Sequence, residues 1–334
     1  MKDFKIGLAL GGGAARGWAH IGVLKALADA GIVPDIVVGT SMGAVVGGCY
    51  VADELGELED FARSLTRRKV LGYLDFNFAG SGLITGQRLC DRLNQKLCDI
   101  DIEKLGRAYV AVATELGTGQ EIWLNKGKLV DAMRASYALP GIFRPVQHNG
   151  RWLFDGALVN PIPVSVARAL GARYVIAVNL NADMSGRGSF TAVHADSHMP
   201  HRAGLSVQDF GAIDPVDDTA ALDVPGNRLI RNGRALKKML QRQFFGRGES
   251  GPGISTVMME AFNIVQDRIA RSRLAGDPPD VVISPRTSDL GLFDFHRADE
   301  LISRGSYATK RVIDDIEREI ELRRRFKPIL HMGA

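Results

Sequence analysis

The sequence predicts an α/β protein with a mainly parallel central sheet, and two observations lead to this class. Short apolar runs alternate along the chain with longer segments whose apolar residues follow helical spacing. Glycine-rich turns follow the first two of these runs. Glycine is also in excess, at 38 of 334 residues, against a usual share of about 7%. Apolar strands joined by helices are typical of parallel sheets, because each parallel connection needs a crossover.

The first fifty residues already show this alternation. Residues 4–10 form an apolar run that ends at three glycines, which predicts a buried strand and a tight turn. Residues 17–31 carry apolar side chains at helical spacing and end at a glycine. Residues 35–39 then predict a second buried strand, and the small residues of 42–52 predict a second helix. This order is that of a parallel strand–helix–strand unit.

The same alternation continues toward the C-terminus. The later strand candidates are residues 108–114, 121–124, 152–154, 174–179 and 281–284. Helical patterns fall at residues 86–97, 129–135 and 255–274, and a charged helix is expected over roughly 299–325. The pattern therefore returns to a strand and helices after a long interruption.

That interruption is marked by a change in composition. Residues 181–225 hold seven acidic and two basic side chains, whereas residues 226–248 hold seven basic and no acidic ones. We therefore expect a core over 1–182, an insertion or mobile cap over 183–253, and C-terminal helices and a strand over 254–334 that complete the core.

Charge and cysteine content exclude several classes of protein. Three cysteines cannot form a disulfide framework, which favours a reducing, cytoplasmic location. A net charge of +4 is too small to indicate nucleic-acid binding. No apolar run reaches the roughly 18 residues of a spanning helix, and residues 6–10 are too short for a signal peptide. Residues 227–246 form a basic amphipathic pattern, suited either to an anionic membrane surface or to packing on its own domain.

The sharpest local feature is the sequence Gly-Thr-Ser-Met-Gly at residues 39–43. It fits G-x-S-x-G, and it lies between a predicted strand and a predicted helix, where a nucleophilic serine requires it. The flanking Gly39 and Gly43 keep a strained turn free of side chains. The helix that follows Ser41 would place partial positive charge beside a developing oxyanion. The alternative is an ordinary Gly/Ser turn.

The glycine-rich loop at residues 11–17, GGGAARG, allows two interpretations. It resembles a dinucleotide-binding loop, but Gly17 falls one residue late and the expected acidic residue after the second strand is missing. The better interpretation is an oxyanion hole, in which backbone N–H groups of the loop lie beside a serine on the next strand. Arg16 would hold the loop, meet a phosphate or form an ordinary ion pair.

A nucleophilic serine needs a base, and the residues alone leave two candidates. Asp155 ends an apolar strand in Asp-Gly, where its carboxylate could accept the proton of Ser41; Asp-Gly is also a common turn. Among the histidines, His296 follows a plausible strand end. The seven histidines are His20, His148, His194, His198, His201, His296 and His331. Neither they nor the cysteines show a metal-ligand spacing, so we expect no metal.

Taken together, the motifs GGGAARG, GTSMG and DGA resemble, in this order, those of the patatin-like phospholipase family. Further segments are similar to the bacterial members related to neuropathy target esterase: SGLITG at 81–86, RASYALPGIFRPV at 134–146 and DGALVNPIPVSVARALGA at 155–172. The resemblance covers roughly residues 5–182, and residues 255–315 more weakly. Three ordered motifs are far more specific than a lone G-x-S-x-G.

The resemblance implies a three-layer α/β/α fold with a nucleophile elbow. It also implies a Ser-Asp dyad without histidine, with Ser41 as nucleophile and Asp155 as base. The oxyanion hole would consist of the amides around Gly12, Gly13 and Ala14. The supporting residues would be Gly11, Arg16, Gly17, Gly39, Gly43 and Gly156.

The activity implied is hydrolysis of phospholipid, lysophospholipid or other lipid esters through an acyl-enzyme, without a cofactor. The protein would be cytoplasmic, with possible peripheral contact with an anionic membrane. One departure is Ala14, where related sequences often have a fourth glycine. A positive φ there would strain the loop. A non-catalytic regulatory protein that retains the fold is the alternative.

Overall fold

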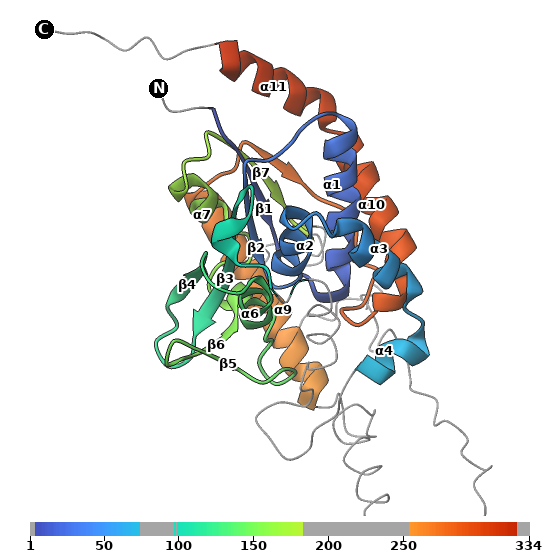
Figure 1. Cartoon of the computed structure of the whole chain (residues 1–334). Coiled ribbons are helices and arrows are strands. Elements are labelled where there is room, and N and C mark those ends of the chain that lie inside the picture. Colours follow the sequence, from blue (N-terminus) through green and yellow to red (C-terminus); the bar gives the residue numbers. More distant parts are fainter. Residues whose placement is uncertain (1–3, 74–96, 98, 183–253, 326–334) are drawn as a thin grey trace, which may run out of the picture. The chain divides into compact units, whose positions relative to one another are not determined.

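The computed structural model describes residues 4–73, 97, 99–182 and 254–325 (Figure 1). By internal contacts the chain divides into residues 1–191 with 266–334, and residues 192–265. The expected helix at 86–97 (apart from Leu97), the insertion 183–253 and its amphipathic pattern at 227–246 lie outside the described residues.

Eight strands form a single sheet within the described part of the chain. They are β1 (Ile6–Leu10), β2 (Ile36–Thr40), β3 (Ala108–Glu115), β4 (Glu121–Leu124), β5 (Val146–His148), β6 (Arg151–Asp155), β7 (Tyr174–Val178) and β8 (Val281–Ile283). The strand order is β5-β6-β3-β2-β1-β7-β8, and β4 pairs with β3 beside this row. β3, β2, β1, β7 and β8 run parallel, which confirms the predicted class of sheet.

Helices lie on both faces of the sheet (Figure 1). They are α1 (Ala19–Asp29), α2 (Met42–Val51), α3 (Leu55–Ser64), α4 (Arg67–Tyr73), α6 (Leu129–Ser136), α7 (Val164–Ala169), α9 (Ile254–Gly276), α10 (Ala298–Lys310) and α11 (Ile313–Arg325). Short 3₁₀ turns occur at Ala14–Trp18, Ile102–Lys104, Gly156–Leu158 and Phe295–Arg297.

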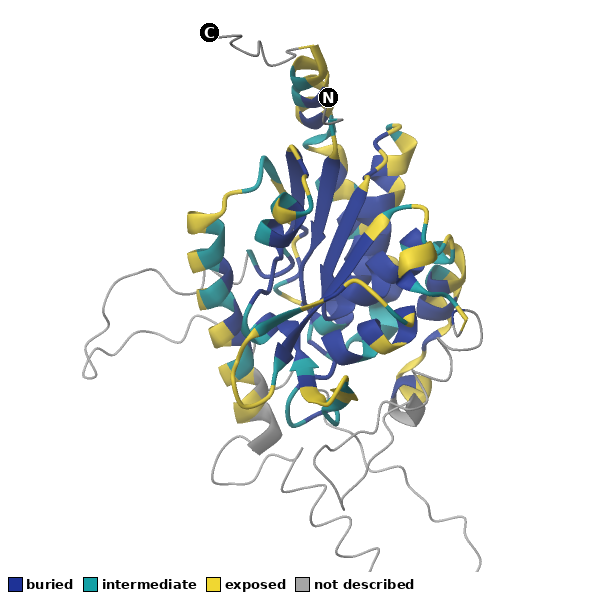
Figure 2. Ribbon diagram, turned by 60° about the vertical axis from the view of Figure 1, so that its left-hand side comes forward, coloured by how far each residue is buried: buried dark blue, intermediate teal, exposed yellow. Residues whose placement is uncertain are grey.

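The two faces of the sheet bury separate apolar clusters, and Figure 2 shows that the central strands are buried. On β1, Leu8 and Leu10 belong to the cluster beneath α1, α2, α6 and α10. Ala9, between them, belongs to the other cluster, with residues of α7 and Ala270 of α9. Successive strand side chains point to opposite faces, so one apolar strand serves both layers. The result is the predicted α/β/α arrangement.

Three local expectations were wrong or incomplete. The first helix is preceded by a 3₁₀ turn at residues 14–18, and β5 was not predicted. The expected single helix over 299–325 is two helices, α10 and α11. Their charged pattern is continuous, but α10 packs along α1 whereas Arg323 of α11 pairs with Asp280 beside β8. Tertiary contacts therefore decide where the helix breaks.

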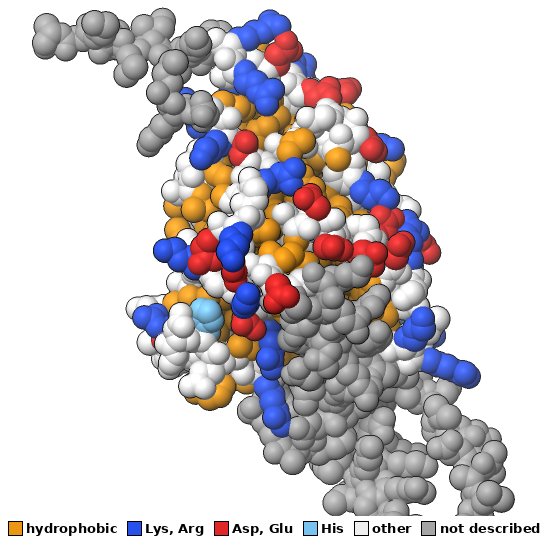
Figure 3. Space-filling model, in the orientation of Figure 1, with side chains coloured by type: hydrophobic (Ala, Val, Ile, Leu, Met, Phe, Trp, Pro, Cys, Tyr) orange, Lys and Arg blue, Asp and Glu red, His pale blue; other side chains and the backbone are white. Residues whose placement is uncertain are grey.

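Acidic, basic and apolar side chains are interspersed over the described part of the face shown in Figure 3. This face therefore shows no continuous basic patch of the kind that binds nucleic acid among the described residues.

The register of β3 brings two other strand ends together. Val112 pairs with Thr40, the last residue of β2, and Ala113 pairs with Asp155, the last residue of β6. Because β4 occupies the other edge of β3 over the same stretch, β2 and β6 approach each other end to end along one edge. The residues at both ends therefore lie next to each other.

The contact between α1 and α10 yields a prediction about stability. A methyl group at Gly22 would collide with the backbone carbonyl of Ile302, whereas nothing lies within 4 Å of one at Gly56 on α3. We expect Gly22→Ala to destabilise the fold by about 1–3 kcal/mol. Gly56→Ala should be neutral or stabilising by up to about 1 kcal/mol, because alanine favours a helix. Urea unfolding would measure both, and equal effects would contradict the close approach.

Candidate active site

Ser41 occupies a strained turn between β2 and α2. Its backbone has φ 56° and ψ −125°, a conformation that non-glycine residues rarely adopt. A side chain at Gly39 would strike the backbone of Gly43, and one at Gly43 would strike the carbonyl of Leu10. The glycines on both sides of Ser41 are therefore required by close packing, as the G-x-S-x-G pattern predicts. The turn places Ser41 at the N-terminus of α2, where the helix dipole favours negative charge.

The Ser41 hydroxyl donates a hydrogen bond to Asp155. The distance from Oγ to Oδ2 is 2.7 Å, and the other carboxylate oxygen accepts the Ala157 N–H at 2.8 Å. Asp155 is 1% exposed and Ser41 is 8% exposed. The end-to-end arrangement of β2 and β6 thus places a serine hydroxyl and a carboxylate in contact with each other in a buried position.

Burial raises the pKa of Asp155 to about 7, although the hydrogen bonds from Ser41 and Ala157 oppose the shift. A carboxyl group that titrates near neutrality can both accept and return a proton at physiological pH. This property suits a general base.

Ser136, which the sequence motifs do not single out, supports the turn at Ser41. Its Oγ accepts the Ser41 N–H at 2.9 Å and donates to the Val112 carbonyl at 2.6 Å. Ser136 is fully buried near the end of α6, among apolar residues. The sequence did contain a signal for this role: Ser136 lies on the apolar face of an amphipathic helix, and a buried hydroxyl needs hydrogen-bond partners.

The glycine loop passes directly beside Ser41. A Cβ on Gly12 would lie 3.4 Å from the Ser41 Cβ. The Gly12 N–H, however, donates to the Pro161 carbonyl at 3.0 Å, so the expectation that it serves the oxyanion hole is wrong in this conformation. The N–H groups of Gly13 and Ala14 have no acceptor within the described residues. These two remain as candidate donors.

Ala14 has φ 47°, in the left-handed region. The strain that we expected if Ala14 had a positive φ is therefore present in the structure. An L-residue in this region costs about 1–2 kcal/mol, and such strain persists only where surrounding contacts fix the backbone. The loop must be held from outside.

Arg16 supplies part of that support. It is 2% exposed; its Nε donates to the Leu290 carbonyl at 3.0 Å and its Nη1 to Asn181 Oδ1 at 3.1 Å. Of the three roles allowed by the sequence, these contacts favour holding the loop. The remaining supporting glycines pack tightly, and side chains at Gly11, Gly17 and Gly156 would meet Val178, Met42 and Val112, respectively.

None of the histidines within the described residues hydrogen-bonds to Ser41. His20 is buried and donates from Nε2 to the Gly11 carbonyl at 2.7 Å; burial lowers its pKa to about 4, so it is neutral. His296 accepts from Arg67 Nε at 3.2 Å, and its pKa is lowered, chiefly by burial. His148 lies on β5. The histidines at 194, 198, 201 and 331 lie outside the described residues.

Two further findings bear on alternative sites. Within the described ranges, no group of three or more potential metal ligands lies together. An open groove of about 750 Å³ runs between β8 and α10, and its lining does not include Ser41 or Asp155. It is therefore separate from the hydroxyl–carboxylate pair.

The fold and site define a class: a three-layer α/β protein with a nucleophile elbow, a buried carboxylate on its serine and a glycine loop alongside, as in serine hydrolases. A family model described as "Patatin-like phospholipase" matches residues 8–168. An uncharacterized NTE family protein of Mycobacterium tuberculosis (strain H37Rv) is 32% identical over 332 residues, 94% of this chain and 92% of that protein. This chain belongs to the patatin-like phospholipase family, which confirms the resemblance drawn from its motifs.

Two more distant similarities were also found. Human patatin-like phospholipase domain-containing protein 6 is 36% identical over 186 residues, 53% of this chain and 13% of that protein. The crystal structure of VipD from Legionella pneumophila aligns with 14% identity and a TM-score of 0.44, over 94% of this chain and 67% of that one. Family membership indicates a lipid hydrolase.

The buried carboxyl predicts an unusual dependence of stability on pH. The pKa of Asp155 is raised by folding from 3.8 to about 7. Between these values the folded state binds more protons than the unfolded state, so this group's contribution to stability falls as pH rises. Asp155→Asn, which cannot ionise, should be more stable than wild type at pH 8 by on the order of 1–3 kcal/mol.

Near pH 4 the difference between Asp155→Asn and wild type should largely disappear. Thermal unfolding of both proteins at pH 4, 6 and 8 would measure it. A difference that stays constant with pH would show that Asp155 does not titrate in this range.

Proposed function

We propose that this protein is a serine esterase that hydrolyses phospholipid, lysophospholipid or related lipid esters, with Ser41 as nucleophile and Asp155 as base. The observation that carries the proposal is the 2.7 Å hydrogen bond from a strained elbow serine to a buried carboxylate whose pKa is near 7. Membership of the patatin-like phospholipase family supports the choice of a lipid ester.

Acylation follows from this geometry. Ser41 Oγ attacks the ester carbonyl carbon while its proton moves to Asp155 Oδ2, and the carbonyl electron pair moves to oxygen. The N–H groups of Gly13 and Ala14, the candidate donors, would stabilise this oxyanion, each by about 3–4 kcal/mol, together with the N-terminus of α2. When the tetrahedral intermediate collapses, the C–O bond breaks and the leaving alcohol takes the proton from Asp155.

Deacylation repeats these steps with water. Asp155 accepts a proton from a water molecule that attacks the acyl-enzyme carbonyl. Collapse of the second tetrahedral intermediate releases the fatty acid, and the proton returns to Ser41 Oγ. The serine, the carboxyl group, the substrate and water account for every proton and electron pair in this sequence of steps.

We propose that the enzyme is cytoplasmic and meets its substrate peripherally at an anionic membrane surface. The low cysteine content and the basic amphipathic pattern at residues 227–246 support this proposal, although that pattern lies outside the described residues. Among the helices that the structure describes, none combines the length and apolarity needed to cross a bilayer.

The proposed nucleophile can be tested by covalent labelling. A fluorophosphonate probe should modify Ser41, and Ser41→Ala should lower kcat/KM for a lysophospholipid or short-chain ester by at least about 10³-fold. Ser303→Ala, which removes an exposed hydroxyl that donates to the helix carbonyl of Asp299, is the control and should retain activity. Unlabelled protein without esterase activity would instead favour the non-catalytic regulatory alternative.

The proposed base predicts the acidic limb of the pH profile. Because Asp155 must be ionised to accept the serine proton, kcat/KM should fall about tenfold per pH unit below about pH 7, the value to which burial raises its pKa. Asp155→Asn should remove nearly all activity. Wild-type activity that is independent of pH between 5 and 8, or substantial activity in the variant, would assign the base elsewhere, with His296 to be tested next.

A further inference from the structure

One segment from the C-terminal part of the chain holds the glycine loop through its backbone. Residues 290–295 supply three carbonyl groups to residues 15–18. The three contacts are Ala15 N to Leu292 O (3.0 Å), Arg16 Nε to Leu290 O (3.0 Å) and Trp18 Nε1 to Phe295 O (3.2 Å). The Trp18 and Phe295 rings also meet edge to face, with centroids 6.0 Å apart. The loop beside Ser41 therefore rests on a segment more than 270 residues away in sequence.

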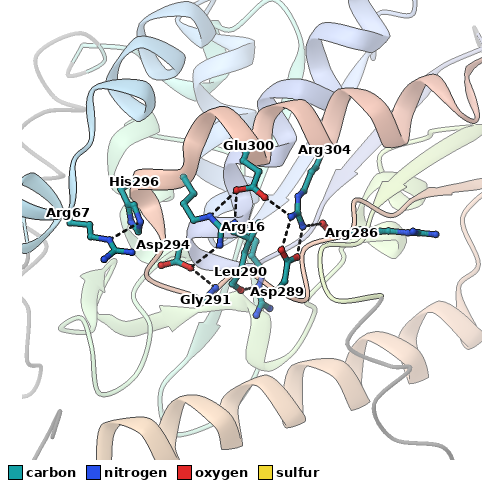
Figure 4. A network of polar contacts seen from close by, with 11 residues as sticks. Arg16, Arg67, Arg286, Asp289, Leu290, Gly291, Asp294, His296, Glu300 and Arg304 are labelled. Carbon is teal, nitrogen blue, oxygen red and sulfur yellow. Dashed lines mark hydrogen bonds and ion pairs between the residues drawn. The ribbon is translucent and has the colours of Figure 1, made fainter. Parts of the chain in front are cut away.

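This supporting segment is itself fixed by α10 (Figure 4). Arg304 of α10 donates to both carboxylate oxygens of Asp289, to the Arg286 carbonyl and to Glu300. The Thr287 hydroxyl donates to the Leu180 carbonyl at 2.7 Å. These contacts hold the residues that immediately precede Leu290 in the chain. The carbonyl that meets Arg16 consequently has a defined position.

Arg16 connects this support to the strained part of the loop. Its N–H donates to the Gly13 carbonyl at 3.1 Å, which closes the turn that contains Ala14. Its guanidinium reaches Leu290 and Asn181, so one side chain joins the turn to two other segments. The left-handed backbone at Ala14 is unfavourable by itself and depends on such contacts. Without the guanidinium, the turn would be free to relax.

We propose that Arg16 is a positioning residue for the oxyanion hole: its buried guanidinium, held by Leu290 and Asn181, fixes the turn that presents the N–H groups of Gly13 and Ala14. This inference rests on the proposed esterase function. Arg16 acts through the loop backbone and does not touch the reacting atoms. The donors are misplaced when it is removed, whereas Ser41 and Asp155 keep their own contacts.

The kinetic test uses Arg16→Ala in the full chain. Loss of an oxyanion donor costs about 10²–10³-fold in kcat, so we expect a fall of this order with little change in KM, because the contact matters in the transition state. Added guanidinium at non-denaturing concentration should restore part of kcat. Ala14→Gly in the same variant should also restore part of it, since glycine adopts the left-handed conformation without strain.

Arg168→Ala is the matched control. Arg168 of α7 also donates to backbone carbonyls and to Asp280, but it lies beside the N-terminal end of β7, away from the elbow. Its loss should leave kcat and guanidinium dependence unchanged. If Arg16→Ala does not fold, Arg16→Lys keeps the charge but cannot reproduce both directional contacts, and the same measurements apply to it.

Hydrogen–deuterium exchange separates this inference from the proposed function, because it requires no activity. The amides of residues 11–18 should exchange faster in folded Arg16→Ala than in wild type or Arg168→Ala, with β2 and α2 unchanged. Unaltered exchange of the loop amides in Arg16→Ala would overturn the positioning role. A loss of kcat in proportion to the fraction of molecules whose Ser41 no longer reacts with the fluorophosphonate probe would also overturn it. Ester hydrolysis that persists in Ser41→Ala would instead overturn the proposed function, whatever the loop exchange shows.

Discussion

The arrangement of the site depends on one edge of β3. There β2 runs parallel to β3 and β6 runs antiparallel to it, so that the C-terminal ends of β2 and β6 meet. Adjacent residues of β3 pair with Thr40 and Asp155, the final residues of these two strands. The strands cannot overlap there, so one turns sharply into α2 through Ser41 and the other ends in a 3₁₀ turn whose Ala157 N–H binds the carboxylate. The Ser41–Asp155 hydrogen bond is a consequence of this register. A slip of one residue in either strand would point its terminal side chain to the opposite face.

Burial gives this hydrogen bond its chemical character. A carboxylate removed from water loses hydration, and two hydrogen bonds do not fully compensate, so the proton is held more tightly than in solution. The same enclosure that destabilises ionised Asp155 adapts it to proton transfer near neutral pH. The glycine loop shows a related compromise: Ala14 is held in an unfavourable conformation by contacts that reach the C-terminal part of the chain. Stability and site geometry are thus set by the same contacts.

Backbone carbonyls provide much of the support around the site. The Pro161 carbonyl accepts the Gly12 N–H, whereas the Gly13 and Ala14 N–H groups meet no acceptor in the part of the chain that the structure describes. Gly11 accepts from a neutral, buried His20. Pro161 and Leu290, which supply two of these carbonyls, lie on segments distant from the loop in sequence. Their side chains reveal little about the role, because a carbonyl is common to every residue. This is why the motif GGGAARG indicated an oxyanion loop but not which of its amides is available.

The sequence by itself determined the alternation of strands and helices, the elbow at Ser41 and the identity of Asp155 as a candidate base. These features are local: apolar periodicity, glycine at a strained turn and an Asp-Gly strand end. It left Asp155 and His296 as rival bases and Arg16 with three possible roles. Only the tertiary structure joined Ser41 to a carboxyl 114 residues away and Arg16 to a carbonyl 274 residues away. It also divided the last helical pattern in two. Such contacts depend on strand register and helix packing, which bring distant segments together and which no local pattern records.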